Sequence, residues 1–115
     1  ILDAYNANPT SMAAALENFD AMEGHRKIAV LGDMFELGET AAMEHQVIAD
    51  LAGQMEFDKV LLIGENFFES ETPLKKFKSY EAAKEYLEEN LVGNNASILI
   101  KGSRGMALKQ VLALI

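Results

Sequence analysis

The chain has 115 residues, of which 50% are hydrophobic and 24% charged, with a formal net charge of −8 and no cysteine. This length and composition fit one globular domain; they exclude disulfides and thiolate metal sites and argue against a nucleic-acid groove, which needs a cationic surface. A small anionic ligand stays open, because a local pair of cations can outweigh a distant acidic surface.

A strand and a helix are predicted at the beginning of the chain. Residues Ile1–Tyr5 suit a short strand, and Asn8 and Pro9 suit the cap and the first residue of a helix. Gly24 would end this helix in a left-handed conformation. Its buried stripe would comprise Met12, Ala15, Leu16, Phe19 and Met22.

The rest of the chain repeats this alternation. Apolar runs predict strands at Lys27–Leu31, Asp58–Ile63 and Ile98–Ile100, with a brief strand at Lys75–Lys78. A helix capped by Thr40 would bury Val47, Ile48, Leu51, Ala52 and Met55. A short helical turn is expected at Glu65–Glu71. A helix from Ser79 to about Leu91 would bury Ala83, Tyr86, Leu87 and Leu91 and expose an acidic face. A last helix would follow Gly105.

Alternating strands and helices predict an α/β domain, with an open and mostly parallel sheet covered by helices on both faces. In such sheets ligands bind beyond the carboxyl ends of the strands. We therefore expect three segments that follow strands to share one solvent-exposed edge of the sheet, with Asp3 and Lys101 on neighbouring or near-neighbouring strands. The polar residues in these segments are Asp3, Asn6 and Asn8, then Asp33, and then Lys101, Ser103 and Arg104.

Each of these residues also has an ordinary structural interpretation. Asp3 can cap a turn, Asn8 can simply cap its helix, and Asp33 can satisfy nearby backbone N–H groups. Lys101 and Arg104 are the strongest candidates, since Arg forks onto a carboxylate or phosphate and Lys supplies a movable charge. Either could instead pair with an acidic residue of the loop after the second strand. His45 could face that loop or the core.

Several signatures of catalysis are missing. The sequence has no G-x-x-x-x-G-K-[ST] phosphate loop, no G-x-G-x-x-G dinucleotide fingerprint, and no His, Asp and Glu cluster at metal-ligand spacing. We expect no metal site and no catalytic residue in this chain, and we expect it to be a fragment of a longer enzyme, inactive in isolation. The abrupt start at Ile1 agrees with that expectation.

Three blocks, in this order and spacing, resemble the C-terminal domain of the Mur ligases: residues 3–12, residues 30–38 with His45 downstream, and residues 99–104. The similarity covers nearly the whole chain, as one C-terminal domain over residues 1–115. Tyr5-Asn6-Ala7-Asn8, where other Mur ligases tend to have Tyr-Ala-His, resembles the branch that adds D-alanyl-D-alanine to UDP-N-acetylmuramoyl-tripeptide in peptidoglycan synthesis.

The resemblance implies a Rossmann-like domain that closes over the nucleotide of an ATP-dependent amide ligase. ATP would phosphorylate the substrate carboxylate, the dipeptide amine would attack the acyl phosphate, and phosphate would leave. ATP and magnesium would be held mainly by a central domain. By the same resemblance, Asp3 would bind the ribose of ATP, and Asn6 and Asn8 would line the cleft between nucleotide and substrate. Asp33, Lys101, Ser103 and Arg104 would face the dipeptide or the transferring phosphate.

Two other interpretations remain. The first is a stand-alone α/β module that binds a small anionic metabolite without catalysis. The second is a receiver-like signalling domain, but Gly64 follows the third strand where a receiver places its phosphorylated Asp. For the ligase we expect a cytoplasmic monomer that neither binds nucleic acid nor inserts into a membrane.

Overall fold

A computed structural model describes residues 2–3, 8–24, 26–91 and 96–102 of the chain. Strands and helices alternate along most of it, as the apolar runs predict. The elements in order are β1 (Leu2–Asp3), α1 (Pro9–Ala21), β2 (Lys27–Gly32), the 3₁₀ turn η1 (Gly38–Thr40), α2 (Ala41–Gln54), β3 (Lys59–Ile63), α3 (Glu65–Phe68), β4 (Lys75–Phe77), α4 (Tyr80–Leu91) and β5 (Ser97–Lys101). The helix predicted after Gly105 lies outside the described residues.

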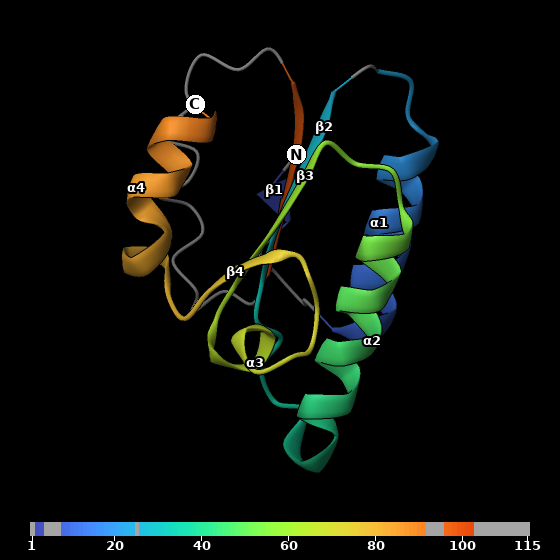
Figure 1. The fold of residues 1–115 in the computed structure, drawn as a ribbon. Helices are drawn as coiled ribbons and strands as arrows, with labels where there is room; N and C mark the ends of the chain where they lie inside the picture. The colour runs from blue at the N-terminus through green and yellow to red at the C-terminus, as the bar shows by residue number, and fades with distance from the viewer. Residues whose placement is uncertain (1, 4–7, 25, 92–95, 103–115) are drawn as a thin grey trace.

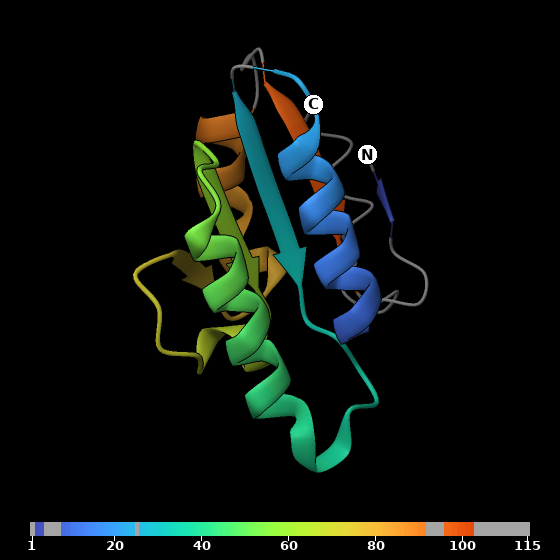
Figure 2. The ribbon, with the colours of Figure 1, turned by 90° about the vertical axis from the view of Figure 1, so that its right-hand side faces the viewer.

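The five strands form one parallel sheet in the order β1-β5-β2-β3-β4. Helices α1 and α2 cover one face and α4 covers the other, so the domain has three layers (Figure 1). The predicted α/β class with a parallel sheet is confirmed. In Figure 2, β2 runs downward between the helices, and the turn that leads into α2 extends below its carboxyl end. Among the described helices, none is long and apolar enough to cross a membrane.

Each face of the sheet buries its own hydrophobic cluster. Alternate residues of a strand point to opposite faces, so Ala29 and Leu31 pack under α1 and α2, whereas Ile28 and Val30 pack under α4. The central strands show no polar alternation because both of their faces are covered. These two clusters hold the sheet rigid and fix the positions of the loops at its ends.

Two of the predicted helix starts are confirmed in detail. The Asn8 side chain accepts a hydrogen bond from the Ser11 backbone N–H at 2.9 Å, and the Ser11 hydroxyl accepts one from the Asn8 N–H at 3.1 Å. This reciprocal pair is a capping box, which satisfies two otherwise unpaired donors. Ser79 caps α4 by accepting from the Ala82 N–H at 3.2 Å.

Three details of the helices differ from the prediction. Helix α1 ends at Ala21 with an extended Met22, which is 42% exposed, and Gly24 has φ 156°, outside the left-handed helical region. Val47 was expected inside but is 53% exposed, because α2 turns His45, Ile48, Ala49 and Ala52 toward the sheet instead. Helical periodicity alone leaves the phase of a buried stripe uncertain by about one residue on either side.

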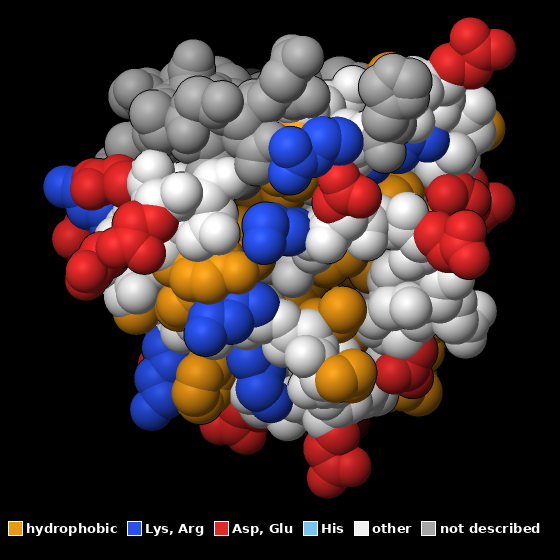
Figure 3. Space-filling view, turned by 45° about the horizontal axis from the view of Figure 1, so that its top comes forward, with side chains coloured by type: hydrophobic (Ala, Val, Ile, Leu, Met, Phe, Trp, Pro, Cys, Tyr) orange, Lys and Arg blue, Asp and Glu red, His pale blue; other side chains and the backbone are white. Residues whose placement is uncertain are grey.

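Strand β4 forms one edge of the sheet and carries lysines that lie over aromatic rings. The Lys75 Nζ is 5.5 Å from the Phe77 ring centre and 5.2 Å from that of Tyr86, and the Lys78 Nζ is 5.2 Å from that of Phe68. On the face in Figure 3, basic side chains lie beside hydrophobic ones, although the chain as a whole is acidic. Lys75 and Lys78 are held by these contacts with aromatic rings.

Candidate ligand site at the carboxyl edge of the sheet

The carboxyl ends of four strands lie side by side. Asp3 is opposite Lys101 in the β1–β5 pair, Lys101 is opposite Leu31 in the β5–β2 pair, and Gly32 is opposite Ile63 in the β2–β3 pair. The prediction that Asp3 and Lys101 lie on neighbouring strands, at the same edge as the loop after β2, is therefore confirmed. This edge gathers the polar segments that the sequence separates widely.

The structure describes only some of the predicted site residues. Asn6, Ser103 and Arg104 lie outside the described residues, and for Asp3 the backbone alone is described, as the end of β1. Asn8 is exposed and uses its side chain to cap α1. Its capping role is thus observed, and a part in nucleotide binding stays a prediction.

Asp33 is 3% exposed and ties the end of β2 to α3. Its Oδ2 accepts hydrogen bonds from the backbone N–H of Asn66 at 2.8 Å and from the Asn66 side-chain amide at 3.0 Å. Its Oδ1 accepts from the Phe67 N–H at 3.0 Å. The carboxylate therefore satisfies the first N–H groups of α3, which is the structural role open to it from the sequence.

Gly64 makes this close approach possible. A Cβ at this position would lie 2.3 Å from Cγ and from Oδ1 of Asp33, and φ is +134°, a value that side chains with a Cβ rarely adopt. No other residue could occupy this turn without displacing the Asp33 carboxylate. The glycine that closes β3 and the aspartate that follows β2 thus form one unit.

His45 completes the buried polar group below the edge. Its Nδ1 lies 2.7 Å from the Ala41 carbonyl oxygen, so Nδ1 carries the proton and donates, while Nε2 accepts from the Met34 N–H at 2.9 Å. These two bonds define a neutral ring, 3.7 Å from Oδ1 of Asp33 and packed edge-on against Phe67. Both positions predicted for His45 therefore apply, because the ring lies in the core and also holds the loop after β2.

Lys101 ends β5 and is only 1% exposed. We expected a solvent-exposed edge, and for Lys101 and Asp33 this is wrong. Lys101 stands two residues after Leu99, on the sheet face that α1 and α2 cover, and its strand is flanked on both sides. Lys101 and Asp33 are therefore buried beneath this edge and do not lie on its outer surface.

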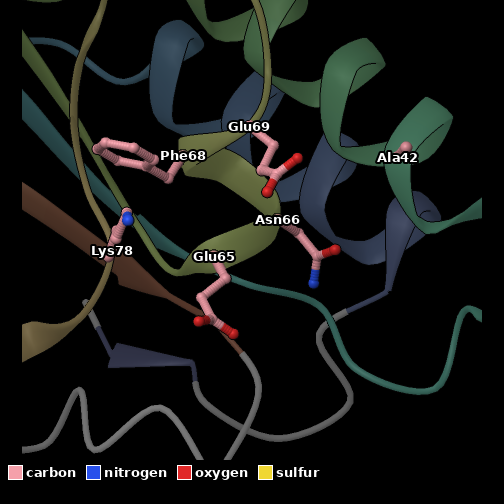
Figure 4. Close-up of a pocket in the computed structure, with 6 residues that line it drawn as sticks. All are labelled: Ala42, Glu65, Asn66, Phe68, Glu69 and Lys78. Carbon is pink, nitrogen blue, oxygen red and sulfur yellow. The ribbon is translucent and has the colours of Figure 1, made fainter.

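One part of the edge was not predicted. A cavity of about 440 Å³ lies over α3 and is lined by Ala42, Glu65, Asn66, Phe68, Glu69 and Lys78 (Figure 4). The lining comes from the start of α2, from α3 and from the segment after β4. The available signal was the Gly-Glu-Asn sequence at the exit of β3, since this exit lies at the same edge as the other polar loops.

Comparison with known protein families and structures identifies relatives of this chain. Residues 1–104 match the model of the Mur ligase, glutamate ligase domain. The UDP-N-acetylmuramoyl-tripeptide–D-alanyl-D-alanine ligases of Bacillus subtilis and Escherichia coli are 38% and 30% identical to this chain, over 97% and 96% of its length. The chain spans about a quarter of these relatives, 26% and 25% of their respective lengths.

Solved structures agree with the sequence relatives. A crystal structure of MurF from Acinetobacter baumannii matches 96% of this chain and 26% of its own, with a TM-score of 0.78 at 30% identity. The MurF ligase from Thermotoga maritima in complex with ADP matches 97% of this chain and 26% of its own, with a TM-score of 0.76 at 26% identity. The predicted resemblance to the Mur ligases, and to this branch of them, is confirmed. The chain belongs to the Mur ligase family.

Proposed function

We propose that this chain is the C-terminal domain of an ATP-dependent ligase that joins D-alanyl-D-alanine to UDP-N-acetylmuramoyl-tripeptide in peptidoglycan synthesis. The observation that carries the proposal is the similarity to ligases of that name along 97% of the chain, while the chain spans only 26% of the Bacillus subtilis relative. The alternative of a stand-alone module is less favoured, because the matched relatives are about four times longer.

The proposed roles of the site residues follow the edge of the sheet. Asp3, Asn6 and Asn8 would serve the nucleotide, and Lys101, Ser103 and Arg104 would serve the dipeptide or the transferring phosphate. Asp33 belongs to the same site. Since its oxygens already accept three hydrogen bonds from α3, we assign it the task of positioning that helix.

ATP and magnesium would be held mainly by another domain of the enzyme. Within the part of the chain that the structure describes, no group of three His, Cys, Asp or Glu side chains could hold a metal ion. The residues described here therefore do not fit a magnesium site, and we assign them no step through the ion. Because ATP and the UDP-sugar are nucleotides of the cell interior, we place the enzyme in the cytoplasm. We also propose that it is a monomer.

In this enzyme the domain would form one side of the active site and would close over the bound substrates. The substrate carboxylate is phosphorylated by ATP, the dipeptide amine attacks the acyl phosphate, and inorganic phosphate leaves. Closure expels water and strengthens the charge interactions inside the site. Cations that follow the strand ends, such as Arg104 in the segment after β5, would then meet the negative charge of the transferring phosphate in a site of low dielectric.

The experiment is a phosphate-release assay on the full-length enzyme. Release should require ATP, the UDP-tripeptide and D-alanyl-D-alanine together, and the 115-residue chain alone should release none. Arg104→Ala should lower kcat/KM for the dipeptide by about 10- to 100-fold, since a charge-assisted hydrogen bond contributes roughly 1.5–3 kcal/mol. Arg26→Ala is the matched control, because Arg26 pairs with Asp58 in an exposed ion pair beyond the amino end of β2.

Two results would contradict the proposal. One is metal-dependent ATP turnover by the 115-residue chain on its own. The other is a full-length enzyme whose phosphate release does not respond to the dipeptide.

A further inference from the structure

The loop after β2 carries two exposed side chains at its tip. Asp33 and Met34 are 3% and 1% exposed, whereas Phe35 is 44% exposed and Glu36 is exposed as well. In Figure 2, the segment that leads from β2 into α2 extends past the carboxyl end of the sheet. Phe35 and Glu36, the tip of this loop, are thus presented outside the buried polar groups of the edge.

The backbone of this tip is strained. Glu36 has φ 63°, and in the part of the chain that the structure describes it is the one non-glycine residue with a positive φ. A glycine adopts this left-handed conformation without penalty, whereas a residue with a Cβ loses stability in it. Asn and Asp offset part of the loss through local hydrogen bonds of their short side chains, which the longer Glu side chain is less suited to make. Strain that persists at the edge of a ligand site indicates a function for the side chain that carries it.

Hydrogen bonds on both sides hold the tip in place. Before the tip, the Met34 N–H donates to Nε2 of the buried His45 at 2.9 Å. After the tip, the Leu37 carbonyl oxygen accepts from the Thr40 hydroxyl at 2.9 Å and from the Thr40 N–H at 3.3 Å. A loop that is already ordered loses little conformational entropy when it binds a partner, and this increases its affinity.

Exposed apolar side chains are concentrated in this part of the fold. Phe35, Met43 and Val47 are three of the four large hydrophobic residues that are exposed within the described ranges. Single exposed apolar side chains are ordinary, but three of them in one loop and the first half of the helix that follows favour a surface that a partner covers. The chain spans 26% of the Bacillus subtilis relative, so about three quarters of such an enzyme lies outside it.

We propose that the tip, Phe35 and Glu36, docks against another domain of the same enzyme when this domain closes over the substrates. Phe35 enters an apolar recess of that domain, and the Glu36 carboxylate pairs with a Lys or Arg beside the recess. Aromatic anchors surrounded by polar groups are typical of protein interfaces. A domain surface suits the tip better than a small ligand does, since the loop extends past the strand ends at which ligands of α/β sheets bind. This inference rests on the proposed function, because that function supplies both the other domain and the closing movement.

The first test follows closure by small-angle X-ray scattering of the full-length enzyme. Wild type should have a smaller radius of gyration when a non-hydrolysable ATP analogue and the UDP-tripeptide are bound. Phe35→Ala should abolish this decrease and lower kcat about tenfold, because truncation of an aromatic anchor removes a large share of the energy of an interface. Met22→Ala is the matched control. Met22 is 42% exposed, but it follows α1 at the opposite end of the sheet, so this variant should leave both quantities unchanged.

The second test separates the charge of Glu36 from its strain. Glu36→Gln removes the charge and keeps the strained backbone, whereas Glu36→Gly removes the charge and relieves the strain. Both variants should lower kcat of the full-length enzyme about tenfold, but only Glu36→Gly should raise the melting temperature of the 115-residue chain, by about 3 °C. A side chain that served local structure alone would not combine a gain in stability with a loss of activity. Glu39→Gln is the control, since Glu39 is an exposed carboxylate in the 3₁₀ turn of the same loop.

The inference and the proposed function fail in different ways. If the wild-type enzyme does not ligate the dipeptide, the proposed function falls first. If wild type ligates and becomes compact, but Phe35→Ala and Glu36→Gln do so too with kcat within twofold, the tip is not a docking element. If these variants become compact normally and raise KM for one substrate alone, the tip contacts that substrate and not another domain. If Glu36→Gly lowers the melting temperature, Glu36 serves the local structure and the argument from strain is wrong.

Discussion

The two faces of the sheet are packed in different ways. Under α4, the described cluster is apolar apart from the hydroxyl of Tyr80, with Leu87 and Ile100 fully buried. Under α1 and α2, the apolar cluster ends at the carboxyl edge in buried polar groups, among them Asp33 and His45. A buried polar group is tolerated only when its hydrogen bonds are made, so the second face stabilises one exact arrangement of loops. One face gives the domain stability, and the other also determines the geometry of the site.

The largest effect should come from Gly64→Ala. The new Cβ would collide with the Asp33 carboxylate at a backbone conformation that alanine rarely adopts. Strain and overpacking together should lower the free energy of unfolding of the 115-residue chain by about 4 kcal/mol, measured by urea denaturation. Gly53→Ala in α2 is the control; its nearest neighbour would be 3.9 Å away, and a gain of up to about 1 kcal/mol is expected. A loss below about 1 kcal/mol for Gly64→Ala would contradict the close packing of the two loops.

Leu87→Ala tests the apolar face. Removing this fully buried side chain of α4 should cost about 3 kcal/mol of unfolding free energy, since a cavity remains below the helix. In the full-length enzyme KM for the dipeptide should stay within twofold of wild type at a temperature at which the variant is folded. A tenfold change in KM would show that the two faces are not separate in function.

His45→Phe tests the polar face with a ring of similar size. The Met34 N–H would lose its acceptor while remaining buried, which should cost about 2 kcal/mol. This variant is expected to be more stable than Leu87→Ala, yet to raise KM for the dipeptide more, because the loop after β2 loses its anchor. Tyr86→Phe, in the other cluster, is the control for the loss of a polar atom from a ring. If His45→Phe is less stable than Leu87→Ala and raises KM for the dipeptide less, the two faces do not differ in the way described.

The elements were predictable because their signals are local. Apolar runs closed by glycine placed β2 and β3 to within a residue or two, and the Asn8-Pro9 pair placed the start of α1. The errors occurred where local signals end: α1 stopped at Ala21, before the predicted Gly24, and the buried stripe of α2 passed through His45 and not Val47. Tertiary contacts decide the phase and the last turn of a helix.

The site was predictable only in part. Its edge followed from the parallel topology, and the blocks that mark it came from resemblance to the Mur ligases. The partners of Asp33 were not accessible, since they lie 33 and 34 residues further along the chain. The cavity over α3 combines Ala42, Asn66 and Lys78, which only the folded chain brings together. Its exposed carboxylates and lysine are, in sequence, indistinguishable from ordinary surface charges.

The two outer strands of the sheet are short, and this bears on how the protein behaves at high concentration. Strand β1 has two residues and β4 has three, whereas the central strands have five or six. A long unpaired edge is a template on which further chains add as strands and grow into aggregates. Here β4 offers such a template only a three-residue stretch that begins with Lys75 and Lys76, and two like-charged chains would repel each other at that edge. The short β4 edge thereby protects the domain against strand-by-strand self-assembly.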